Sequence, residues 1–369
     1  MRIEAAIVHK KGGPFSIETV ELDEPRANEV LVRNLATGIC HTDLVIRDQF
    51  VPLALPALLG HEGSGIVEKV GDQVRKVEVG DRVVMTFHSC GVCPSCAEGA
   101  PAYCVHLMAN NFSGKRPDGS PSVHLHGQSI SANFFQQSSF ATHSLVTERN
   151  VVRVDGELSN ETLALLGPLG CGIQTGAGAV LNSLRPKAGT ALVVFGAGSV
   201  GISAVMAAKL AGCSTVIAVD LNPSRLELAR QLGATDIVNA RDTDTVDFVR
   251  SRTGGGADYS LETTASAKVL RQAVECLHVR GICGSIGLPP AGTEVTLDML
   301  SILFGRTLKG IIEGDSVPDV FITRLVALFK QGRFPIDKLM THFQFGDINA
   351  AVRATEDGHA LKAILHLPQ

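Results

Sequence analysis

The sequence has no tryptophan and only two tyrosines among its 369 residues. Proteins that bind single-stranded nucleic acids stack the bases on such rings, so this scarcity argues against that class, and likewise against carbohydrate binding. The charges nearly balance, with a formal net charge of −4, which gives no electrostatic reason for binding nucleic acid or an anionic membrane. No apolar run reaches the ~20 residues that a membrane-spanning helix needs. We therefore expect a soluble globular protein with neither nucleic acid nor a membrane as its partner.

The N-terminal segment lacks the apolar region and the small-residue cleavage site of a secretory signal. We therefore expect a cytoplasmic location, where thiols stay reduced. The nine cysteines are an odd number, which also fits poorly with a disulfide framework. Three of them lie in the second half of the chain and are predicted to be small core residues, namely Cys213, Cys276 and Cys283.

Four other thiols lie within fifteen residues, at Cys90, Cys93, Cys96 and Cys104. Four thiolates form a closed tetrahedral shell around Zn²⁺, and short spacers let one loop supply all of them. A thioredoxin-like redox motif is the alternative, but it needs only two thiols beside a βαβ unit. We predict a structural zinc site here. Because a closed shell performs no chemistry, a catalytic site has to be sought elsewhere in the chain.

The chain exceeds the usual size of one domain, so we expect two. Over the first 150 residues, alternating runs separated by Gly-Asp turns predict a β-barrel-like region with strands at 29–34, 65–70 and 81–86. Beyond it, helical patterns at 200–211 and 223–232 alternate with apolar runs typical of buried parallel strands. These strands are expected at 191–195, 215–220, 236–238, 257–261 and 281–286. The alternation predicts a doubly wound α/β sheet.

Two further segments have a distinct pattern. Residues 105–137 are polar and without a clear period, so we predict a long loop near a site or an interface. Residues 361–366 form a strand-like run close to the C-terminus.

A glycine-rich turn directly follows the apolar run at 191–195 and precedes a helical pattern. In this context a G-x-G-x-x-G motif predicts a dinucleotide site: Gly196 permits the turn, Gly198 admits a pyrophosphate, and Gly201 lets helix and strand pack closely. The helix N-terminus offers free N–H groups to the phosphates. Nineteen residues after Gly201, Asp220 can accept hydrogen bonds from the adenosine ribose and would repel a 2′-phosphate. This favours NAD over NADP, although Arg225 could contact either group.

Three glycine-flanked stretches carry further metal ligands, at Cys40, His61 and Cys171. Two thiolates and one imidazole leave one position of a tetrahedral zinc open for water or substrate. Taken singly, each residue could be an ordinary buried cysteine or a hydrogen-bonded histidine. The set as a whole predicts a catalytic zinc site.

These motifs resemble, over essentially the whole chain, the zinc-dependent medium-chain alcohol dehydrogenases, whose catalytic zinc has a Cys₂His ligand set. The stretch 310–317 is similar to the aryl-alcohol (benzyl alcohol) dehydrogenase branch of that family. The resemblance implies a GroES-like β-barrel catalytic domain formed by residues 1–172 and 313–369. A Rossmann NAD-binding domain at residues 173–312 would be inserted in it.

The resemblance also assigns roles around the catalytic zinc. Cys40, His61 and Cys171 would hold the metal, Glu62 would be a transient ligand, and Asp43 would accept a hydrogen bond from His61. Thr42 would be the first hydroxyl of a proton relay. Relatives often carry a histidine three residues further on, where this chain has Val45, so the relay must end differently. On the cofactor side, the residues implied are His41, Thr175, Gly196, Gly198, Val200, Gly201, Asp220 and Arg225.

The activity that the resemblance implies is the reversible oxidation of a primary alcohol to the aldehyde, with NAD⁺ as hydride acceptor and two Zn²⁺ per subunit. The predicted pocket walls are Phe87, Phe134, Phe135, Leu303 and Ile312. An aromatic, apolar channel favours benzyl-type or terpenoid allylic alcohols over ethanol. The other interpretation of these phenylalanines is that they are ordinary core residues.

Two alternative functions remain open from the sequence. A glutathione-dependent formaldehyde dehydrogenase would need basic groups for the glutathione carboxylate, and Lys115 and Arg116 are candidates. A non-catalytic relative is disfavoured because all zinc ligands and Thr42 are present. By resemblance we expect a homodimer or homotetramer, with the apolar segment 295–312 as an exposed sheet edge that pairs across a two-fold axis.

Overall fold

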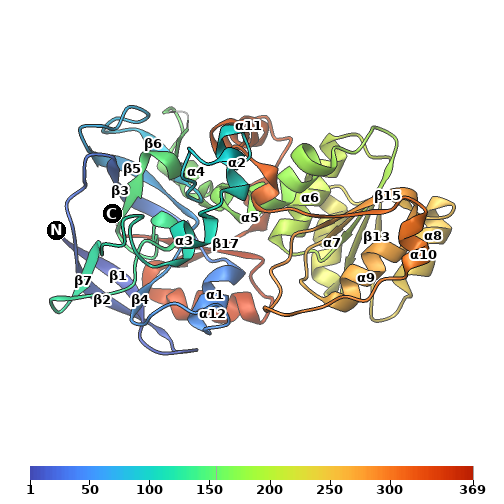
Figure 1. The fold of residues 1–369 in the computed structure, drawn as a ribbon, viewed down its shortest axis with the longest axis horizontal. Coiled ribbons are helices and arrows are strands. Elements are labelled where there is room, and N and C mark those ends of the chain that lie inside the picture. The colour runs from blue at the N-terminus through green and yellow to red at the C-terminus, as the bar shows by residue number, and fades with distance from the viewer. Residues whose placement is uncertain (155, 369) are drawn as a thin grey trace. The chain divides into compact units, whose positions relative to one another are not determined.

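The computed structural model describes residues 1–154 and 156–368, which form two compact units (Figure 1). The first unit comprises residues 1–171, 317–330 and 336–369, and the second comprises 172–316 and 331–335. The sequence analysis ended the inserted domain at residue 312, but 313–316 belong to the second unit. Ser316 donates a hydrogen bond to Gln174 Oε1 of that unit at 2.9 Å, which ties the segment to it.

The first unit is built from two sheets. The smaller has the strand order β4-β1-β2-β7-β8 and the larger β10-β6-β5-β3-β18-β17, with β9 pairing with β3. The strands are β1 (Arg2–Val8), β2 (Phe15–Leu22), β3 (Glu29–Gly38), β4 (Ala57–Leu58), β5 (Gly63–Val70), β6 (Arg82–Met85), β7 (Val123–Leu125), β8 (Gln128–Ser129), β9 (His143–Thr147), β10 (Val151–Arg153), β17 (Met340–Gln344) and β18 (Lys362–His366). The strand-like run predicted at 361–366 is thus β18, which pairs antiparallel with β3.

Short helices connect these strands. They are α1 (His41–Arg47), α2 (Pro94–Ala97), α3 (Leu107–Phe112), α4 (Asn160–Ala164), α11 (Pro318–Lys330) and α12 (Ile348–Glu356). The prediction of one long loop over 105–137 was wrong, because α3, β7, β8 and a 3₁₀ turn at Phe134–Gln136 lie within it. Buried amide side chains hold this segment, so its polar composition did not mean exposure; Asn111 and Gln136 are fully or almost fully buried.

The second unit contains one six-stranded parallel sheet with the order β13-β12-β11-β14-β15-β16. Its strands are β11 (Ala191–Phe195), β12 (Thr215–Asp220), β13 (Asp236–Asn239), β14 (Ala257–Glu262), β15 (Leu277–Ser285) and β16 (Thr307–Gly310). Its helices are α5 (Gly172–Gly178), α6 (Ser199–Leu210), α7 (Pro223–Leu232), α8 (Thr245–Thr253), α9 (Ala267–Glu275) and α10 (Met299–Leu303). Renumbered from its first strand, the order is 3-2-1-4-5-6, the doubly wound arrangement that the sequence predicted.

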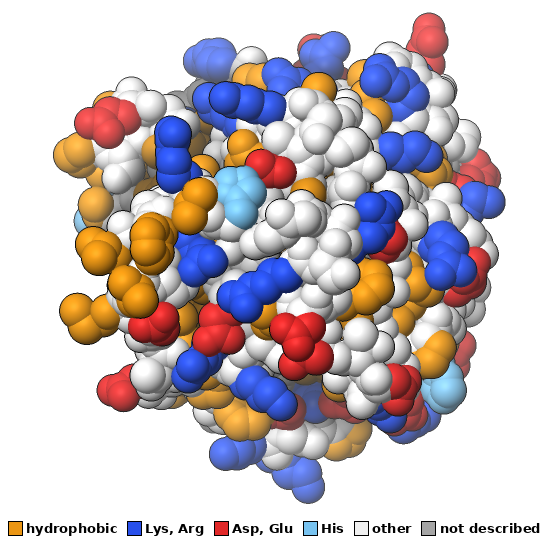
Figure 2. Space-filling view, turned by 90° about the vertical axis from the view of Figure 1, so that its right-hand side faces the viewer, with side chains coloured by type: hydrophobic (Ala, Val, Ile, Leu, Met, Phe, Trp, Pro, Cys, Tyr) orange, Lys and Arg blue, Asp and Glu red, His pale blue; other side chains and the backbone are white. Residues whose placement is uncertain are grey.

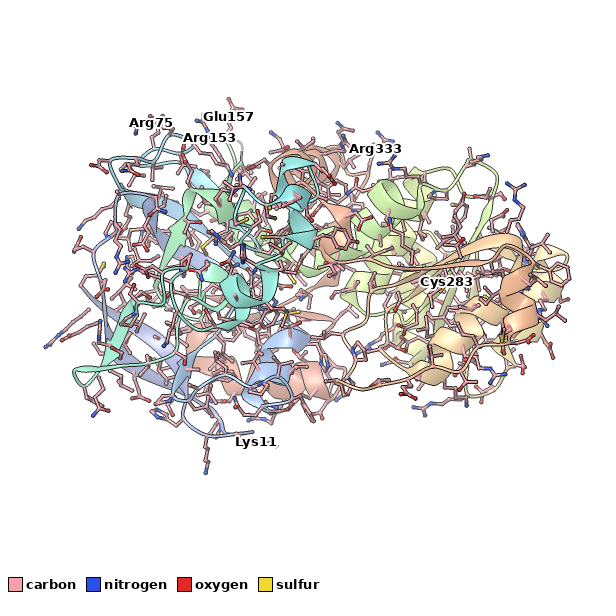
Figure 3. The ribbon with its side chains drawn as sticks, in the orientation of Figure 1. Lys11, Arg75, Arg153, Glu157, Cys283 and Arg333 are labelled. Atoms are coloured by element: carbon pink, nitrogen blue, oxygen red, sulfur yellow. The ribbon has the colours of Figure 1, made fainter. Side chains whose placement is uncertain are left out.

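Apolar runs of the sequence form the centre of this sheet. All five residues of β11 are buried because β12 and β14 flank it and helices cover its faces. The cysteines of this unit divide: Cys276 and Cys283 are buried core residues as predicted, whereas Cys213 is half-buried. Burial raises the pKa of Cys283, labelled in Figure 3, to about 12, so its thiol stays protonated.

Among the described residues, every helix is too short or too polar to span a lipid bilayer.

Candidate active site and metal centres

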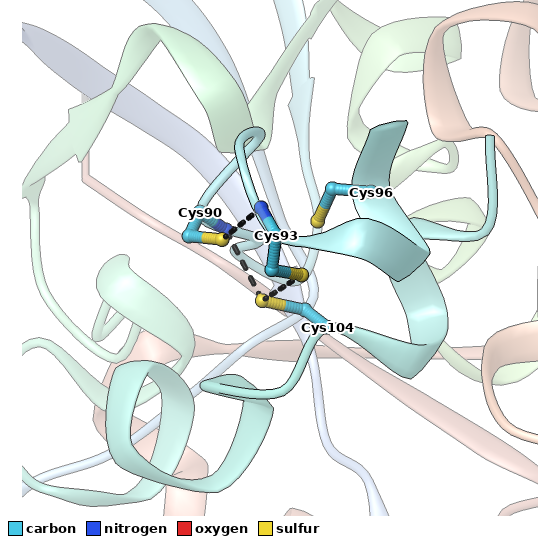
Figure 4. A group of neighbouring side chains, drawn as sticks. All are labelled: Cys90, Cys93, Cys96 and Cys104. Atoms are coloured by element: carbon cyan, nitrogen blue, oxygen red, sulfur yellow. Dashed lines mark hydrogen bonds between the residues drawn. The ribbon is translucent and has the colours of Figure 1, made fainter. Parts of the chain in front are cut away.

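The four-cysteine cluster is formed by one loop and the short helix α2. The sulfur atoms of Cys90, Cys93, Cys96 and Cys104 all lie within 4.8 Å of one another. None forms a disulfide, and the Cys93 and Cys104 sulfurs are 4.0 Å apart (Figure 4). Backbone N–H groups point at the thiols: that of Cys93 donates to Cys90 Sγ at 3.4 Å, and that of Cys90 to Cys104 Sγ at 3.3 Å. Four converging sulfurs with N–H donors behind them fit a tetrahedral zinc.

A second cluster brings together residues that are far apart in the sequence. Cys40 directly precedes α1, His61 lies two residues before β5, and Cys171 follows the 3₁₀ turn Gly167–Gly170. Their ligand atoms lie within 4.8 Å of one another. His61 and Cys171 are buried and Cys40 is half-buried. The structure therefore assembles the three-ligand set that the sequence predicted.

Asp43 holds two of these ligand segments in place. Its Oδ2 accepts a hydrogen bond from the Cys40 backbone N–H at 2.9 Å, and its Oδ1 accepts one from Gly60 N–H at 3.1 Å. The same Oδ1 lies 2.9 Å from His61 Nδ1, as predicted for the residue that orients this imidazole. The carboxylate is fully buried, so these bonds replace its hydration.

The donor set fits a metal ion. With Nδ1 bonded to Asp43, the free ligand atom of His61 is Nε2, which is buried and has no hydrogen-bond partner among the described residues. An unpaired buried nitrogen is costly unless something binds it. Hydrogen bonding with Cys171 holds the pKa of the Cys40 thiol well below its usual range, which favours the thiolate that zinc requires. Two sulfurs and one imidazole nitrogen leave one tetrahedral position open.

Glu62, predicted as a transient zinc ligand, is held in a buried ion pair. Lys362 Nζ donates to both carboxylate oxygens, at 2.9 and 2.8 Å, and to the Ile39 carbonyl at 3.1 Å. Glu62 is 0 % exposed and Lys362 is 3 % exposed. The sequence analysis missed Lys362. The signal was available, because it is the only charge in the apolar run from Leu361 to Leu365.

The predicted relay and pyrophosphate residues lie on α1. Thr42 Oγ1 is 3.8 Å from Cys40 Sγ, which places the hydroxyl beside the second cluster. The His41 side chain is exposed, and Val45 is half-buried on the same helix. These positions leave the roles of Thr42 and His41 as predictions.

The glycine-rich turn joins β11 to α6. Gly196 has φ of +95°, a conformation that glycine adopts without strain. A Cβ on Gly201 would lie 1.8 Å from the Gly196 carbonyl oxygen, whereas a Cβ on Gly198 would meet open space. The turn is therefore tight at Gly196, packed at Gly201 and accessible at Gly198, as a dinucleotide fingerprint requires.

Asp220 stands at the end of β12, next to this turn. Its Oδ2 accepts a hydrogen bond from Ala197 N–H at 2.6 Å, and its Oδ1 accepts bonds from Leu221 and Asn222 N–H. Arg225 follows on α7, and its Nε is buried without a hydrogen-bond partner among the described residues. Val200 lies in the first turn of α6. Thr175, on α5, donates to the Glu313 carboxylate at 3.4 Å.

The predicted pocket walls divide between buried and exposed side chains. Phe87, Phe134 and Phe135 are at most 6 % exposed and belong to the hydrophobic core of the first unit. Their packing is that of core residues, and their role as pocket walls remains a prediction. Leu303 and Ile312 lie in the second unit and are 78 % and 43 % exposed. As pocket walls, these two remain a prediction.

Arg116, one of two candidates for binding a glutathione carboxylate, is committed elsewhere. It is 3 % exposed, and its guanidinium donates to Glu29 at 2.7 and 3.2 Å and to Asp23 at 2.8 Å. Lys115 is exposed. The glutathione-dependent alternative therefore keeps only one of its two basic groups.

Comparison with known proteins agrees with this geometry. Residues 26–156 match the model of the alcohol dehydrogenase GroES-like domain, and residues 199–331 match that of the zinc-binding dehydrogenases. A geraniol dehydrogenase from Castellaniella defragrans is 44 % identical over 365 residues, which is 98 % of this chain and 97 % of the relative. The chain belongs to the zinc-dependent medium-chain alcohol dehydrogenases.

Solved structures support the same assignment. The alcohol dehydrogenase zinc-binding domain protein from Burkholderia ambifaria superposes with a TM-score of 0.98 at 50 % identity. The benzyl alcohol dehydrogenase from Acinetobacter calcoaceticus superposes with a TM-score of 0.96 at 43 % identity. In both comparisons all of each chain is covered. As a zinc-dependent alcohol dehydrogenase, the protein is an oxidoreductase with a GroES-like domain and a Rossmann-type sheet.

Proposed function

We propose that this alcohol dehydrogenase oxidises a primary allylic or aromatic alcohol to the aldehyde, reversibly, with NAD⁺ as hydride acceptor. The observation that carries the chemistry is the cluster of Cys40, His61 and Cys171, whose His61 Nε2 is buried without a hydrogen-bond partner among the described residues. The substrate class rests on the relatives named above, a geraniol dehydrogenase and a benzyl alcohol dehydrogenase. Both act on alcohols whose carbinol carbon adjoins a π system.

The chain's own residues divide the work. Cys40, His61 and Cys171 would hold the catalytic zinc, and Asp43 would keep the His61 imidazole donating from Nδ1. When bound there, Zn²⁺ acts as a Lewis acid that lowers the pKa of an alcohol, and NAD⁺ accepts the hydride. Thr42 Oγ1 would accept the proton that leaves the alcohol. Beyond Thr42 the relay cannot continue through residue 45, because the Val45 side chain has no proton to exchange.

Cys90, Cys93, Cys96 and Cys104 would hold the second Zn²⁺ of each subunit. A closed shell of four thiolates stabilises the lobe and takes no part in the reaction. In the region of Glu62, the ion pair with Lys362 keeps the carboxylate bonded to an ammonium group. If Glu62 were to bind zinc transiently, its hydrogen bonds with Lys362 would first have to break.

The substrate proposal is tested by NADH formation with benzyl, cinnamyl, geranyl and ethyl alcohols and with the glutathione–formaldehyde adduct. We expect kcat/KM for the benzyl and allylic alcohols to exceed that for ethanol by at least about 10-fold, because an added apolar group contributes ~1–3 kcal/mol to discrimination. The highest kcat/KM with the adduct would contradict the proposed substrate class.

For the cofactor we propose NAD, because Asp220 lies at the end of β12 beside the glycine-rich turn. Asp220→Ser removes a charged hydrogen-bond acceptor worth ~1.5–3 kcal/mol, so KM for NAD⁺ should rise about 10-fold or more and the NAD⁺/NADP⁺ preference should fall. The control is Glu227→Ser, which replaces an exposed acidic residue on α7. An unchanged preference in Asp220→Ser would place the ribose contact elsewhere.

We also propose that the protein assembles as a dimer or tetramer through the edge of the parallel sheet. All four residues of β16 are exposed at that edge. Apolar side chains gather along one side of the face drawn in Figure 2. The exposed apolar residues on α10, directly after α10 and on β16 are Met299, Leu300, Leu303, Phe304 and Leu308. Analytical ultracentrifugation should show an oligomer that Met299→Glu dissociates, and a monomeric wild type would refute the proposal.

The cytoplasmic location stays a prediction from the sequence.

A further inference from the structure

A cluster of three phenylalanine rings lies beside the predicted zinc ligand His61, and two of them contact its imidazole. The ring of Phe135 stacks on the imidazole with centroids 4.4 Å apart and planes 20° from parallel. The ring of Phe134 meets the imidazole edge-on, at 5.2 Å and 88°. Phe112 packs edge-on against both of these rings and has no such contact with His61 among the described residues. One face and one edge of the imidazole are therefore covered by aromatic rings.

The segment that supplies these rings has an unusual backbone. Asn133, Phe135, Gln136 and Ser138 have φ of 58°, 51°, 51° and 46°. Asparagine tolerates the left-handed region, but a bulky aromatic residue there is an outlier. Such a conformation is unfavourable in free energy and persists only where its surroundings hold it. A strained segment beside a metal ligand therefore calls for a functional explanation.

Buried side chains hold the strained segment from several sides. Ser138 Oγ accepts a hydrogen bond from Phe134 N–H at 2.9 Å and donates to the Leu58 carbonyl at 2.7 Å. Asn150 Nδ2 donates to the carbonyls of Phe135 and Gln136 at 3.2 and 3.0 Å. These bonds fix the backbone conformation that presents the two rings.

The same segment also reaches the backbone of the zinc ligand. Gln137 Nε2 donates to the His61 carbonyl at 2.9 Å, and Gln137 Oε1 accepts from Gly63 N–H at 3.2 Å. Asp43 restrains His61 only at Nδ1. The covalent bond to Cβ and the hydrogen bond at Nδ1 leave some rotation of the ring plane, and contacts on the ring face and edge restrict this rotation further.

We propose that Phe135 and Phe134 are positioning residues that fix the plane of the His61 imidazole, so that Nε2 keeps the direction a zinc ion requires. The proposal rests on the catalytic zinc of the proposed function. A catalytic site works only while its groups are held within about 0.5 Å and 10–20° of the productive geometry. The strain in residues 133–138 then has a function, because the left-handed backbone at Phe135 belongs to the conformation in which its ring lies flat against the imidazole.

The test compares the zinc-loaded wild type with Phe135→Leu, which keeps an apolar side chain but removes the ring. We expect one of two zinc equivalents to pass to a chelator about 10-fold faster, as is typical when the groups that orient a ligating histidine are removed. We also expect an altered visible spectrum of the Co²⁺-substituted protein, and a lower kcat with an unchanged KM for NAD⁺. Phe135→Met takes its place if the leucine variant does not fold.

Phe15→Leu is the matched control. Phe15 lies in the same hydrophobic core, is 4 % exposed and pairs edge-on with Phe140 at 5.6 Å. It has no ring contact with His61 among the described residues. Both variants should lose thermal stability, but only Phe135→Leu should release zinc faster.

Two outcomes distinguish a failure of the positioning role of Phe134 and Phe135 from a failure of the proposed function. Zinc release and a Co²⁺ spectrum like those of the wild type, in a folded Phe135→Leu or Phe135→Met, would overturn the positioning role alone. A wild type that carries only the zinc of the four-cysteine lobe would overturn the proposed function, and with it the positioning role.

Discussion

The two ligand clusters differ in how the chain assembles them. The four cysteines of the closed cluster lie between residues 90 and 104, whereas the ligands of the open cluster are spread from Cys40 to Cys171. In the closed cluster, one loop and the backbone N–H groups beside it place the sulfurs. The open cluster depends on contacts among β3, α1, β5 and β18. A structural metal site can thus be local, whereas this reactive site is held by the fold of the whole unit.

The two clusters also differ in how deeply the residues around them are buried. Around the open cluster, Asp43, Glu62 and Lys362 are all buried. Asp43 accepts a hydrogen bond from the Cys40 N–H, and Lys362 donates to Glu62. Around the closed cluster, the residues Val92, Glu98 and Val105 are exposed. Solvent can compensate a change at the closed cluster, but a change at the open one leaves a buried charge without its partner. Substitutions should therefore affect the two sites in different ways.

The largest effect is expected for Cys171→Ser. Losing a ligand of the open cluster removes the several kcal/mol of transition-state stabilisation that a Lewis acid supplies, so kcat/KM should fall by about 10³-fold or more. The zinc of the four-cysteine lobe and the dissociation constant for NAD⁺ should not change. NADH formation, metal analysis and NAD⁺ titration check this. Retained turnover would remove Cys171 from the catalytic site.

Lys362→Met should give the largest loss of stability. It leaves Glu62 buried without its cation, which costs about 3–5 kcal/mol. Adding Glu62→Gln should restore part of this, because the uncompensated charge disappears. Urea unfolding followed by circular dichroism measures both, since the chain has no tryptophan to report fluorescence. If the double variant were no more stable than Lys362→Met, the ion pair would not be the source of the effect.

Cys93→Ser tests the closed cluster. Losing a structural zinc removes its contribution to folding, and about 3 kcal/mol would lower Tm by ~5–10 °C. Turnover per zinc-loaded active site should stay near the wild-type value at low temperature. Thermal unfolding and the assay are measured on the same preparation. A variant of unchanged Tm that is inactive would contradict a purely structural role.

The contrast between the clusters also explains what the sequence could and could not predict. Ligand spacing alone predicts the four-cysteine lobe, and the run-turn-helix context predicts the Gly196 fingerprint, because both are local patterns. The open cluster was found by combining three glycine-flanked residues with a family resemblance. The role of Asp43 was likewise predicted from the family resemblance.

What the sequence did not reveal depends on pairings far along the chain. Lys362 reaches Glu62 because β18 pairs with β3, a contact between residues about 300 apart. The contacts of Phe134 and Phe135 with His61 also could not be predicted, because composition does not show the left-handed backbone of this segment. Likewise, Arg116 reads as an available cation until Glu29 and Asp23 are seen to bind it.

The smallest expected effect comes from a matched pair of buried amides, one beside each cluster. Gln137 forms three hydrogen bonds to the backbone at His61, Gly63 and Thr86. Asn111 forms three to the backbone at His88 and Leu107, next to the cysteine lobe. Replacing either with leucine leaves buried backbone groups unpaired, so each variant should lose about 1–3 kcal/mol in urea unfolding.

Activity should separate the two amide variants. Gln137→Leu frees the His61 backbone and should lower kcat several-fold, because a small displacement of a metal ligand is costly to catalysis. Asn111→Leu disturbs only the approach to the closed cluster and should leave kcat unchanged at temperatures where it is folded. Steady-state rates at matched zinc content provide the measurement. Equal losses of kcat would mean that the two clusters depend on the same packing. A loss confined to Gln137→Leu would show that the catalytic rate depends on the groups that support the open cluster and not on those that support the closed one.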